Sequence, residues 1–228
     1  TALTKPVGAP GQDAPSTKNI QIANKLLNSA GWKIGSDGIR TKGGDRLQFK
    51  LLLAGPGFQR IAEPYKNNLK NIGVHLDIKV VQIAEYEERL RNFNFGMIVA
   101  GYGQSRSPGN EQRYMWGSQA ADTPGTRNYM GIKNPAIDEL LENIIQARTR
   151  KNLVTNIQAM DRILTHQFYM VPHWYISYDR AVFWNKFDHP KINPSQNSIA
   201  NNIVEWWWQD NEKDKKLKDA RAKGKSFQ

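Results

Sequence analysis

Two stretches of alternating apolar and polar residues lie in the first half of the chain. From Leu47 to Leu53 every second residue is leucine or phenylalanine, and residues 74–81 alternate in the same way. A period of two is typical of a strand that buries one face. Residues 95–101 form an apolar run, which is typical of a buried strand. We therefore predict strands over 46–53, 74–81 and 95–101 and expect them to share one sheet.

Apolar residues at helical spacing predict the helices. They mark residues 58–72, and a more charged helix is predicted over 84–91. Strands and helices thus alternate in the middle of the chain, which indicates an α/β layered domain. Pro64 lies inside the first helix and should kink it or restart it. Three further amphipathic helices are predicted over residues 19–30, 136–147 and 152–166. We expect a mixed sheet against which all of these helices except 84–91 pack.

Turn residues predict the shorter features. Gly35-Ser36-Asp37 lies between two short polar-apolar segments and predicts a hairpin over residues 32–40, followed by a second turn at Gly43-Gly44. Asn134 and Pro135 have the residue types that begin a helix, as cap and first position. Residues 169–184 are aromatic and β-branched but include a proline, so we expect an edge strand or an irregular one there.

The composition is that of one globular domain without covalent staples. At 228 residues the chain is long enough to bury a core, and it has no cysteine. No apolar stretch approaches the roughly 18 residues of a membrane span. The sequence opens with Thr1 and has neither a charged nor an apolar leader segment, so we expect mature protein or an internal fragment.

The formal net charge of +11 raises a nucleic-acid-binding hypothesis. Residues 212–228 contain seven basic and three acidic residues and so carry +4 of that charge. We interpret this tail as a solvated or frayed terminus, because it is nearly free of apolar residues. No zinc-finger, helix-turn-helix or RNP-type signature accompanies the charge. A basic nucleic-acid-binding module is kept as the alternative function.

The residues offer little catalytic chemistry. Ser105 follows the predicted strand 95–101, but a nucleophile elbow needs a glycine where Ser107 stands. A hydrolase hypothesis therefore rests on Ser105 alone. The four histidines share no metal-binding or catalytic spacing, and no glycine-rich phosphate loop is found. We expect no enzyme activity, no cofactor and no metal site.

The order of several segments resembles a family of binding proteins. These segments are LLNSAGW (26–32), DGIR (37–40), NLKNIGV (68–74), residues 86–101, NPAIDELL (134–141), MDRIL (160–164) and VPHW (171–174). In this order they resemble family 5 of extracellular solute-binding proteins, the peptide, dipeptide and nickel receptors of ABC importers. GQSRSPGNEQ (103–112), followed by Trp116-Gly117-Ser118, most resembles the Yej-type oligopeptide branch of that family.

The resemblance implies a fold and a function. The fold would be the C-terminal lobe of a two-lobed periplasmic binding protein of type II, cluster C-like. Its parts would be a lead-in (1–18), a ligand-binding lobe (19–190) and a segment (191–228) that returns toward a first lobe and ends in the basic tail. The function would be to bind oligopeptides between two lobes in the periplasm of a Gram-negative bacterium. The implied partners are a peptide and the membrane permease of an ABC importer, with no nucleic acid, and we expect a monomer.

The loop that follows residues 95–101 is the expected ligand site, because open α/β sheets bind ligands beyond the carboxyl ends of their strands. Seven tryptophans, several of them outside the periodic elements, also suit contacts with an extended ligand. The expected ligand-binding residues are Tyr102, Gly103, Gln104, Ser105, Arg106, Glu111, Trp116 and Asn128.

One departure from the family affects this site. The family's dipeptide and oligopeptide receptors have a tryptophan and then an aspartate that pairs with the amino terminus of the peptide. Tyr102 and Ser105 stand at these positions here. Either another acid such as Glu111 binds the amine, or the amine is not the main anchor of the ligand.

Overall fold

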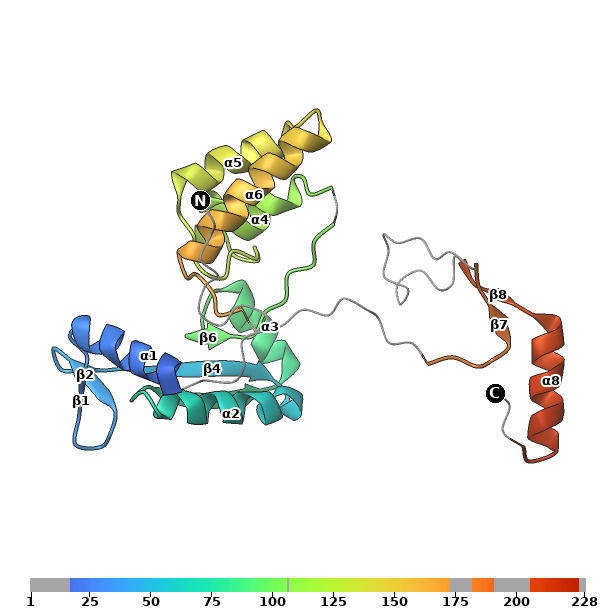
Figure 1. Cartoon of the computed structure of the whole chain (residues 1–228), viewed down its shortest axis with the longest axis horizontal. Coiled ribbons are helices and arrows are strands. Elements are labelled where there is room, and N and C mark those ends of the chain that lie inside the picture. The colour runs from blue at the N-terminus through green and yellow to red at the C-terminus, as the bar shows by residue number, and fades with distance from the viewer. Residues whose placement is uncertain (1–16, 106, 173–181, 191–205, 226–228) are drawn as a thin grey trace. The chain divides into compact units, whose positions relative to one another are not determined.

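The computed structural model describes residues 17–105, 107–172, 182–190 and 206–225. The chain divides into two units, Thr1–Pro172 and His173–Gln228 (Figure 1). The first unit contains a small parallel sheet with its helices and a layer of three further helices. Among its described residues, the second contains a two-stranded ladder and the helix α8 (Asn211–Ala222).

The three predicted strands share one sheet, as expected from their patterns. They are β4 (Gln48–Ala54), β5 (His75–Val81) and β6 (Met97–Ile98), in the order β5-β4-β6. Both pairs are parallel. The prediction of a mixed sheet is therefore wrong for the described strands. The reason is that a helix follows each of the first two strands and returns the chain to the same end of the sheet.

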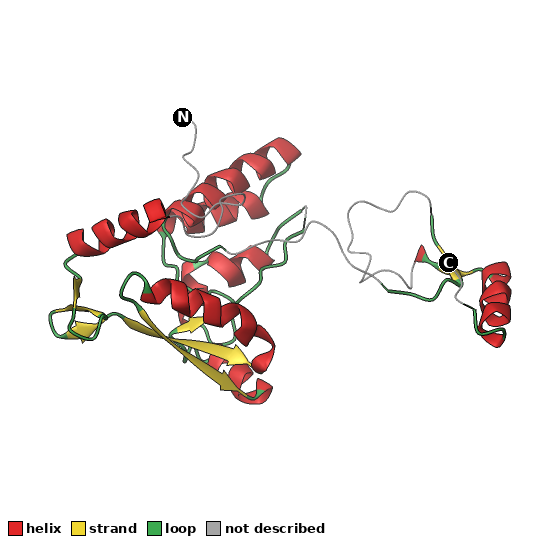
Figure 2. Cartoon of the chain, turned by 60° about the horizontal axis from the view of Figure 1, so that its bottom comes forward, coloured by secondary structure: helices red, strands yellow, loops and turns green. Residues whose placement is uncertain are grey.

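One face of this sheet forms the first hydrophobic core. Leu51, Leu53 and Leu76 are buried there against Ala62 of α2 (Gln59–Lys70). Figure 2 shows α2 lying along the strands. The helix continues through Pro64 as one element, so of the two expectations for this proline, a kink or a restart, the restart is wrong. A turn of 3-10 helix, η1 (Pro56–Phe58), joins β4 to α2. The charged helix α3 (Ile83–Arg91) follows β5, as predicted.

The third strand is much shorter than predicted. Of the apolar run 95–101, only Met97 and Ile98 pair with β4, and both are half-buried. The run is apolar because Met97 and Val99 pack on the sheet core, and not because it crosses the centre of the sheet. Strand β6 is an edge strand among the described residues.

The predicted hairpin and its second turn are confirmed. They form an antiparallel sheet of β1 (Lys33–Ile34), β2 (Arg40–Lys42) and β3 (Asp45–Arg46). The turns use Gly38, Gly43 and Gly44, all with positive φ. The left-handed backbone that these turns need is one that glycine adopts without steric cost.

Arg40 ties the first helix, α1 (Thr17–Ser29), to this hairpin. Its side chain is only 2% exposed. The guanidinium donates to the Asn24 and Asn28 side-chain oxygens of α1, each at 2.7 Å. It also donates to the carbonyls of Trp32 at 2.6 Å and Ile72 at 2.7 Å. A polar contact therefore holds the helix at this point.

The apolar stripe of α1 is not buried as predicted. No residue of the helix is buried, and Leu26 is 64% exposed. The apolar stripe predicted the helix correctly but not its environment. The contacts that the structure describes run through Asn24 and Asn28, which do not belong to the stripe.

A second hydrophobic core belongs to a separate helical layer. It is formed by α4 (Glu111–Trp116), α5 (Pro135–Ile145) and α6 (Arg150–His166), which lie side by side in Figure 1. The side chains of Trp116, Ile137, Leu141 and Met160 are buried in it. The prediction that the helices over 136–147 and 152–166 pack on the sheet is therefore wrong. Their apolar faces are satisfied by one another and by α4.

The predicted start of α5 is confirmed. The Asn134 side-chain oxygen accepts a hydrogen bond from the Ala136 N–H at 3.0 Å, and Pro135 is the first helical residue. Thr149 caps α6 in the same way through the Asn152 N–H at 3.2 Å. Each cap satisfies one of the free N–H groups at the helix start.

The basic tail was expected to be solvated or frayed; its described part is largely exposed but helical, so it is not frayed. Residues Asn211–Ala222 form α8, which Asp210 caps by accepting from the Lys213 N–H at 2.9 Å. Acidic residues in the first turn and Arg221 in the last interact favourably with the helix dipole. These local electrostatic interactions stabilise the helix in place of an apolar stripe. The nucleic-acid hypothesis rests on the charge alone.

The two short strands of the second unit are β7 (Phe187–Asp188) and β8 (Trp208–Gln209), which pair antiparallel. Residues 182–190 thus group with the chain after 206, whereas the predicted lobe ended at 190. The domain bounds remain a prediction. The irregular strand predicted over 169–184 falls largely on residues 173–181, which lie outside the described residues.

Candidate functional site

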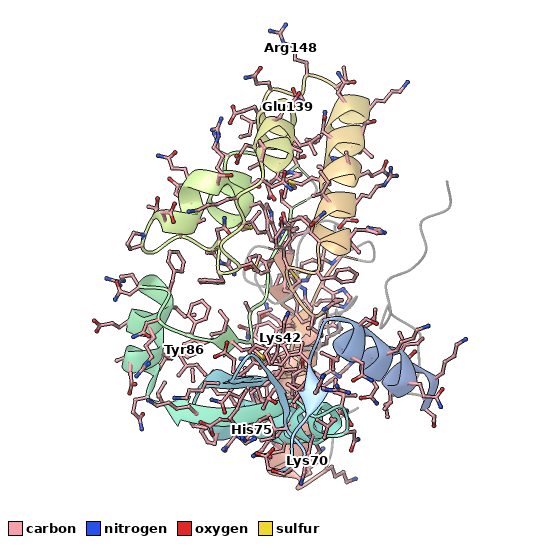
Figure 3. All side chains as sticks on the ribbon, turned by 90° about the vertical axis from the view of Figure 1, so that its left-hand side faces the viewer. Lys42, Lys70, His75, Tyr86, Glu139 and Arg148 are labelled. Carbon is pink, nitrogen blue, oxygen red and sulfur yellow. The ribbon has the colours of Figure 1, made fainter. Side chains whose placement is uncertain are left out.

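The segment that follows β6 runs from the edge of the sheet to α4. On the sheet side, the Tyr86 hydroxyl of α3 donates to the Val99 carbonyl at 3.4 Å. Figure 3 shows Tyr86 between α3 and this part of the chain. The segment is therefore supported from α3 before it leaves the sheet.

Tyr102 is the main anchor of the segment on the helical layer. Its ring packs on Trp116 with 4.8 Å between ring centroids, and its hydroxyl donates to the Arg127 carbonyl at 3.1 Å. Burial raises the pKa of this hydroxyl to about 12; Tyr129 acts in the same direction and the Arg127 guanidinium against it. The hydroxyl therefore stays protonated at neutral pH and keeps its role as a donor.

Gln104 is exposed, but its side chain is held by a buried neighbour. Gln112 is 1% exposed and donates through Nε2 to Gln104 Oε1 at 2.7 Å. In turn, Gln112 Oε1 accepts from Trp116 Nε1 at 2.9 Å. The core of the helical layer thus fixes the orientation of a side-chain amide at its surface. Sequence reasoning missed Gln112, because a buried glutamine in a short helix looks like any exposed one.

Glu111 begins α4 and is ionised at neutral pH. Its Oε1 accepts from the Gly109 N–H at 2.8 Å and from Gln112 Nε2 at 3.1 Å. Partial burial raises the pKa of Glu111, but these hydrogen bonds lower it more, so the pKa lies below its ordinary value. The exposed carboxylate is available for a cationic group.

The other predicted residues of the segment are placed in part. Ser105 is exposed, and its Oγ accepts from the Ser107 N–H at 3.2 Å. A side chain on Gly103 would contact no other atom within 4 Å, so the main chain there is open. Arg106 lies outside the described residues.

Two predicted ligand-binding residues are buried. Trp116 is 5% exposed and belongs to the helical core. Asn128 is 1% exposed, and its Nδ2 donates to the carbonyls of Gly117 and Ile132, each at 2.9 Å. Its Oδ1 accepts from the Ile132 N–H at 2.9 Å. Both side chains therefore support the site from within the folded interior, not from its exposed surface.

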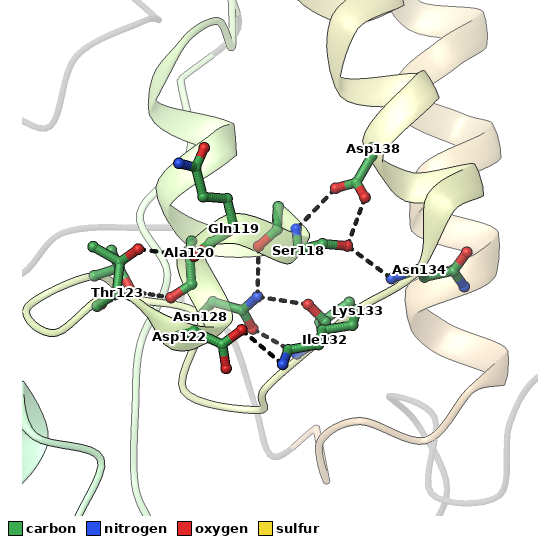
Figure 4. A network of polar contacts seen from close by, with 12 residues as sticks. Ser118, Gln119, Ala120, Asp122, Thr123, Asn128, Ile132, Lys133, Asn134 and Asp138 are labelled. Carbon is green, nitrogen blue, oxygen red and sulfur yellow. Dashed lines mark hydrogen bonds and ion pairs between the residues drawn. The ribbon is translucent and has the colours of Figure 1, made fainter.

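A polar network fastens the loop around Asn128 to α5 (Figure 4). Asp138 accepts from the Ser118 N–H at 2.8 Å and from the Ser118 hydroxyl at 2.5 Å. The Ser118 hydroxyl oxygen also accepts from the Asn134 N–H at 3.1 Å. Within the described ranges, no buried side-chain nitrogen or oxygen lacks a hydrogen-bond partner. Asp138 is thus a structural carboxylate in this network.

Replacing Asn128 with alanine is expected to lower the free energy of unfolding by about 2 kcal/mol, because it leaves buried backbone groups of Gly117 and Ile132 without partners. Urea unfolding followed by circular dichroism measures the change. The matched control is Asn143→Ala on the exposed side of α5, which should change the stability by less than about 0.5 kcal/mol. Equal effects in the two variants would contradict the conclusion that the Asn128 side chain holds the backbone of this loop.

A hollow of about 490 Å³ lies at the carboxyl ends of β4 and β5. Residues 54–56 line one side, and residues 79–83 with Glu85 line the other. Because the sheet is parallel, this is also the edge from which the chain leaves β6. Sequence reasoning did not single out this hollow, although Gly55-Pro56-Gly57 after a strand signalled it. The hollow thus lies at the carboxyl ends of β4 and β5, and the chain that leads to the segment 101–111 leaves β6 at the same end of the sheet.

Comparison with known proteins identifies the family of this chain. The model of bacterial extracellular solute-binding proteins, family 5 Middle, matches residues 1–124. The chain belongs to this family. It is 37% identical to the protein y4wM of Sinorhizobium fredii over 209 residues, which is 91% of this chain and 31% of that protein.

The likeness extends to a protein with a named role and to a solved structure. The chain is 34% identical to the probable peptide-binding protein YejA of Agrobacterium fabrum over 87% of this chain and 32% of that protein. The oligopeptide-binding protein AppA of Bacillus subtilis, solved with a nonapeptide, matches with a TM-score of 0.64 at 21% identity, over 83% of this chain and 37% of AppA. The chain spans about a third of the length of these relatives.

Family membership decides between a binding protein and an enzyme. Solute-binding proteins of this family are not enzymes, so Ser105 has no nucleophilic role to fill. In the part of the chain that the structure describes, no group of three or more histidine, cysteine or acidic residues is placed to hold a metal ion. No helix within the described ranges has the length and apolar character to cross a membrane.

Proposed function

We propose that this chain is the C-terminal lobe of a longer peptide-binding protein that serves an ABC importer. The observation that carries the proposal is the 34% identity to the probable peptide-binding protein YejA over 87% of the chain. The α/β fold with its open carboxyl edge supports it, because that edge is where such sheets bind ligands. The protein acts in the periplasm as a monomer, and its second partner is the membrane permease.

The segment 101–111 forms this lobe's share of the peptide site. Tyr102 and Gln104 are held in place by the helical core. Gly103 and Ser105 give a main chain and small side chains that a peptide backbone can approach. Since β6 is an edge strand among the described residues, a peptide can also pair with its outer edge as an added strand, which gives affinity with little demand on sequence.

Glu111 takes the place of the missing acid at position 105 in this proposal. It is exposed, ionised and held by the Gly109 N–H and by Gln112. A carboxylate in this state pairs with an ammonium group without first losing a proton. Trp116 and Asn128 act through packing and through the loop they hold, since both are buried.

Closure of two lobes completes the mechanism. Each lobe contributes contacts, and closing them excludes water from the peptide, which strengthens every polar contact. The permease then recognises the closed form. In this scheme the lobe described here supplies a preformed surface, and the first lobe supplies the opposite wall.

The Gln104→Ala variant of the full-length protein is expected to bind peptides about fivefold more weakly, a loss of about 1 kcal/mol, because the removed amide is exposed and fixed at the proposed surface. Calorimetry with a pool of synthetic tri- to pentapeptides measures the affinity. Gln119→Ala is the matched control, since Gln119 is exposed and points away from the network in Figure 4. Unchanged affinity in Gln104→Ala would move the site elsewhere, and no binding by the wild type would refute the proposed function.

A further inference from the structure

The backbone of Arg127 is fixed on both sides. Its N–H donates to the Tyr114 carbonyl of α4 at 2.9 Å, and its carbonyl accepts from the Tyr102 hydroxyl at 3.1 Å. Thr126, just before it, is buried and donates through its hydroxyl to the Ala120 carbonyl at 2.6 Å. The base of the Arg127 side chain is therefore held rigidly beside Tyr102.

The guanidinium of Arg127 lies at the start of the segment 101–111. Nη2 donates to the Gly101 carbonyl at 2.5 Å, and Cζ lies 5.2 Å from the centre of the Tyr102 ring. A ring face and a carbonyl thus orient the planar group, and the residue is half-buried. This arrangement sets the direction of the remaining N–H groups before any ligand arrives.

The charge of Arg127 has no carboxylate partner among the described residues. Two arginines on the neighbouring helices do have such partners: Arg113 binds Glu142 through two hydrogen bonds, and Arg89 binds Glu85 at 2.8 Å. Only one of the five guanidinium N–H donors of Arg127 is used in the described contacts. An oriented cation with unused donors is suited to an anionic group from outside the chain.

We infer that Arg127 is the anchor for a carboxylate of the bound peptide, which rests on the proposed function and adds a ligand group to it. The planar fork of a guanidinium matches the two oxygens of a carboxylate. A side chain on Gly101 would meet no atom within 4 Å, so the described residues leave the approach to this end of the segment open. Partial burial against a neutral ring strengthens the pair relative to one in bulk water.

The carboxylate has two sources, the peptide's C-terminus and an acidic side chain. Calorimetry on the full-length protein therefore uses three pools of random tri- to pentapeptides. The first pool has free C-termini. The second has amidated C-termini and contains aspartate and glutamate. The third is amidated and has asparagine and glutamine in their place. For the wild type we expect the third pool to bind about tenfold more weakly than whichever of the first two supplies the recognised carboxylate.

The test variant is Arg127→Met, which keeps an apolar stem and removes the charge. It should bind the preferred pool about tenfold more weakly and bind all three pools alike. Arg148→Met is the control, because Figure 3 places Arg148 at the end of the helical layer remote from the sheet. This control should keep the wild-type preference in full.

The outcomes separate the inference from the proposed function. A wild type that binds the three pools equally, or an Arg127→Met variant that keeps the preference, overturns the role of Arg127 while peptide binding stands. A wild type that binds no pool refutes the proposed function, and the inference with it. If Arg127→Met unfolds, Arg127→Lys decides. The compact ammonium cannot form the fork, so a reduced preference supports the inference and an undiminished one overturns it.

Discussion

Replacing Arg40 with alanine is expected to lower the free energy of unfolding by about 3 kcal/mol or more. The side chain is 2% exposed and donates four hydrogen bonds at 2.6–2.7 Å. Hydrogen bonds to a charged donor are worth more than neutral ones, and their loss leaves buried acceptors without partners. The variant loses the tie between α1, the hairpin and the turn that precedes β5.

The backbone near Arg40 adds to the expected cost. The Arg40 N–H donates to the Gly73 carbonyl at 2.8 Å, and a side chain on Gly73 would come within 2.8 Å of Arg40 Cγ. The two segments are thus in close contact, and alanine at position 40 leaves a void there. Urea unfolding of the chain, followed by circular dichroism, measures the loss.

The control for Arg40 lies in the same hairpin. Arg46 forms an exposed ion pair with Asp37 at 2.6 Å, and such surface pairs contribute little. Arg46→Ala should therefore lower the stability by less than about 1 kcal/mol. If both variants lost the same amount, the buried guanidinium would not be the tie that the contacts suggest.

The isolated chain of 228 residues is expected to bind peptides at least about 100-fold more weakly than the full-length protein. The proposed site lies between two lobes, so this chain offers one wall and cannot close over the ligand. Contacts from the other lobe and the exclusion of water are both absent.

Parallel calorimetric titrations of the two proteins with the same peptide pool measure this difference. The control is the circular dichroism spectrum of the isolated chain, which should retain its helical content. Micromolar or tighter binding by the folded isolated chain would count against the two-lobe mechanism. It would leave the sheet edge and the segment 101–111 sufficient by themselves.

Sequence patterns predicted the sheet better than the helical layer. The alternation around β4 and β5 reports directly which residues face a core, and a parallel βαβ order leaves few ways to arrange them. The amphipathic faces of α5 and α6 were also predicted, but not their partners. A stripe of apolar residues predicts that one face of a helix is buried but does not identify the element that buries it. In addition, α4 was too short to be recognised from the sequence as the third helix.

The candidate site shows the same limit for polar residues. Tyr102 and Gln104 were found because they follow an apolar run, and the structure places both where the helical core fixes them. Arg40, Gln112 and Arg127 were missed, because hydropathy treats polar side chains as solvated. Their positions follow from hydrogen bonds between segments far apart in the sequence, which no local pattern records.

The two edge strands of the parallel sheet differ in how readily each can pair with a strand of another chain. Strand β5 is one edge within the part of the chain that the structure describes, and it exposes His75, Asp77 and Lys79 in alternation along its length. Exposed charged side chains on an edge strand, here Asp77 and Lys79, oppose its pairing with another strand and so protect a sheet from aggregation. The other edge, β6, carries no such guard at Met97 and Ile98. Among the described strands, the sheet is therefore protected against self-association at β5, whereas β6, the edge next to the proposed peptide site, lacks this protection.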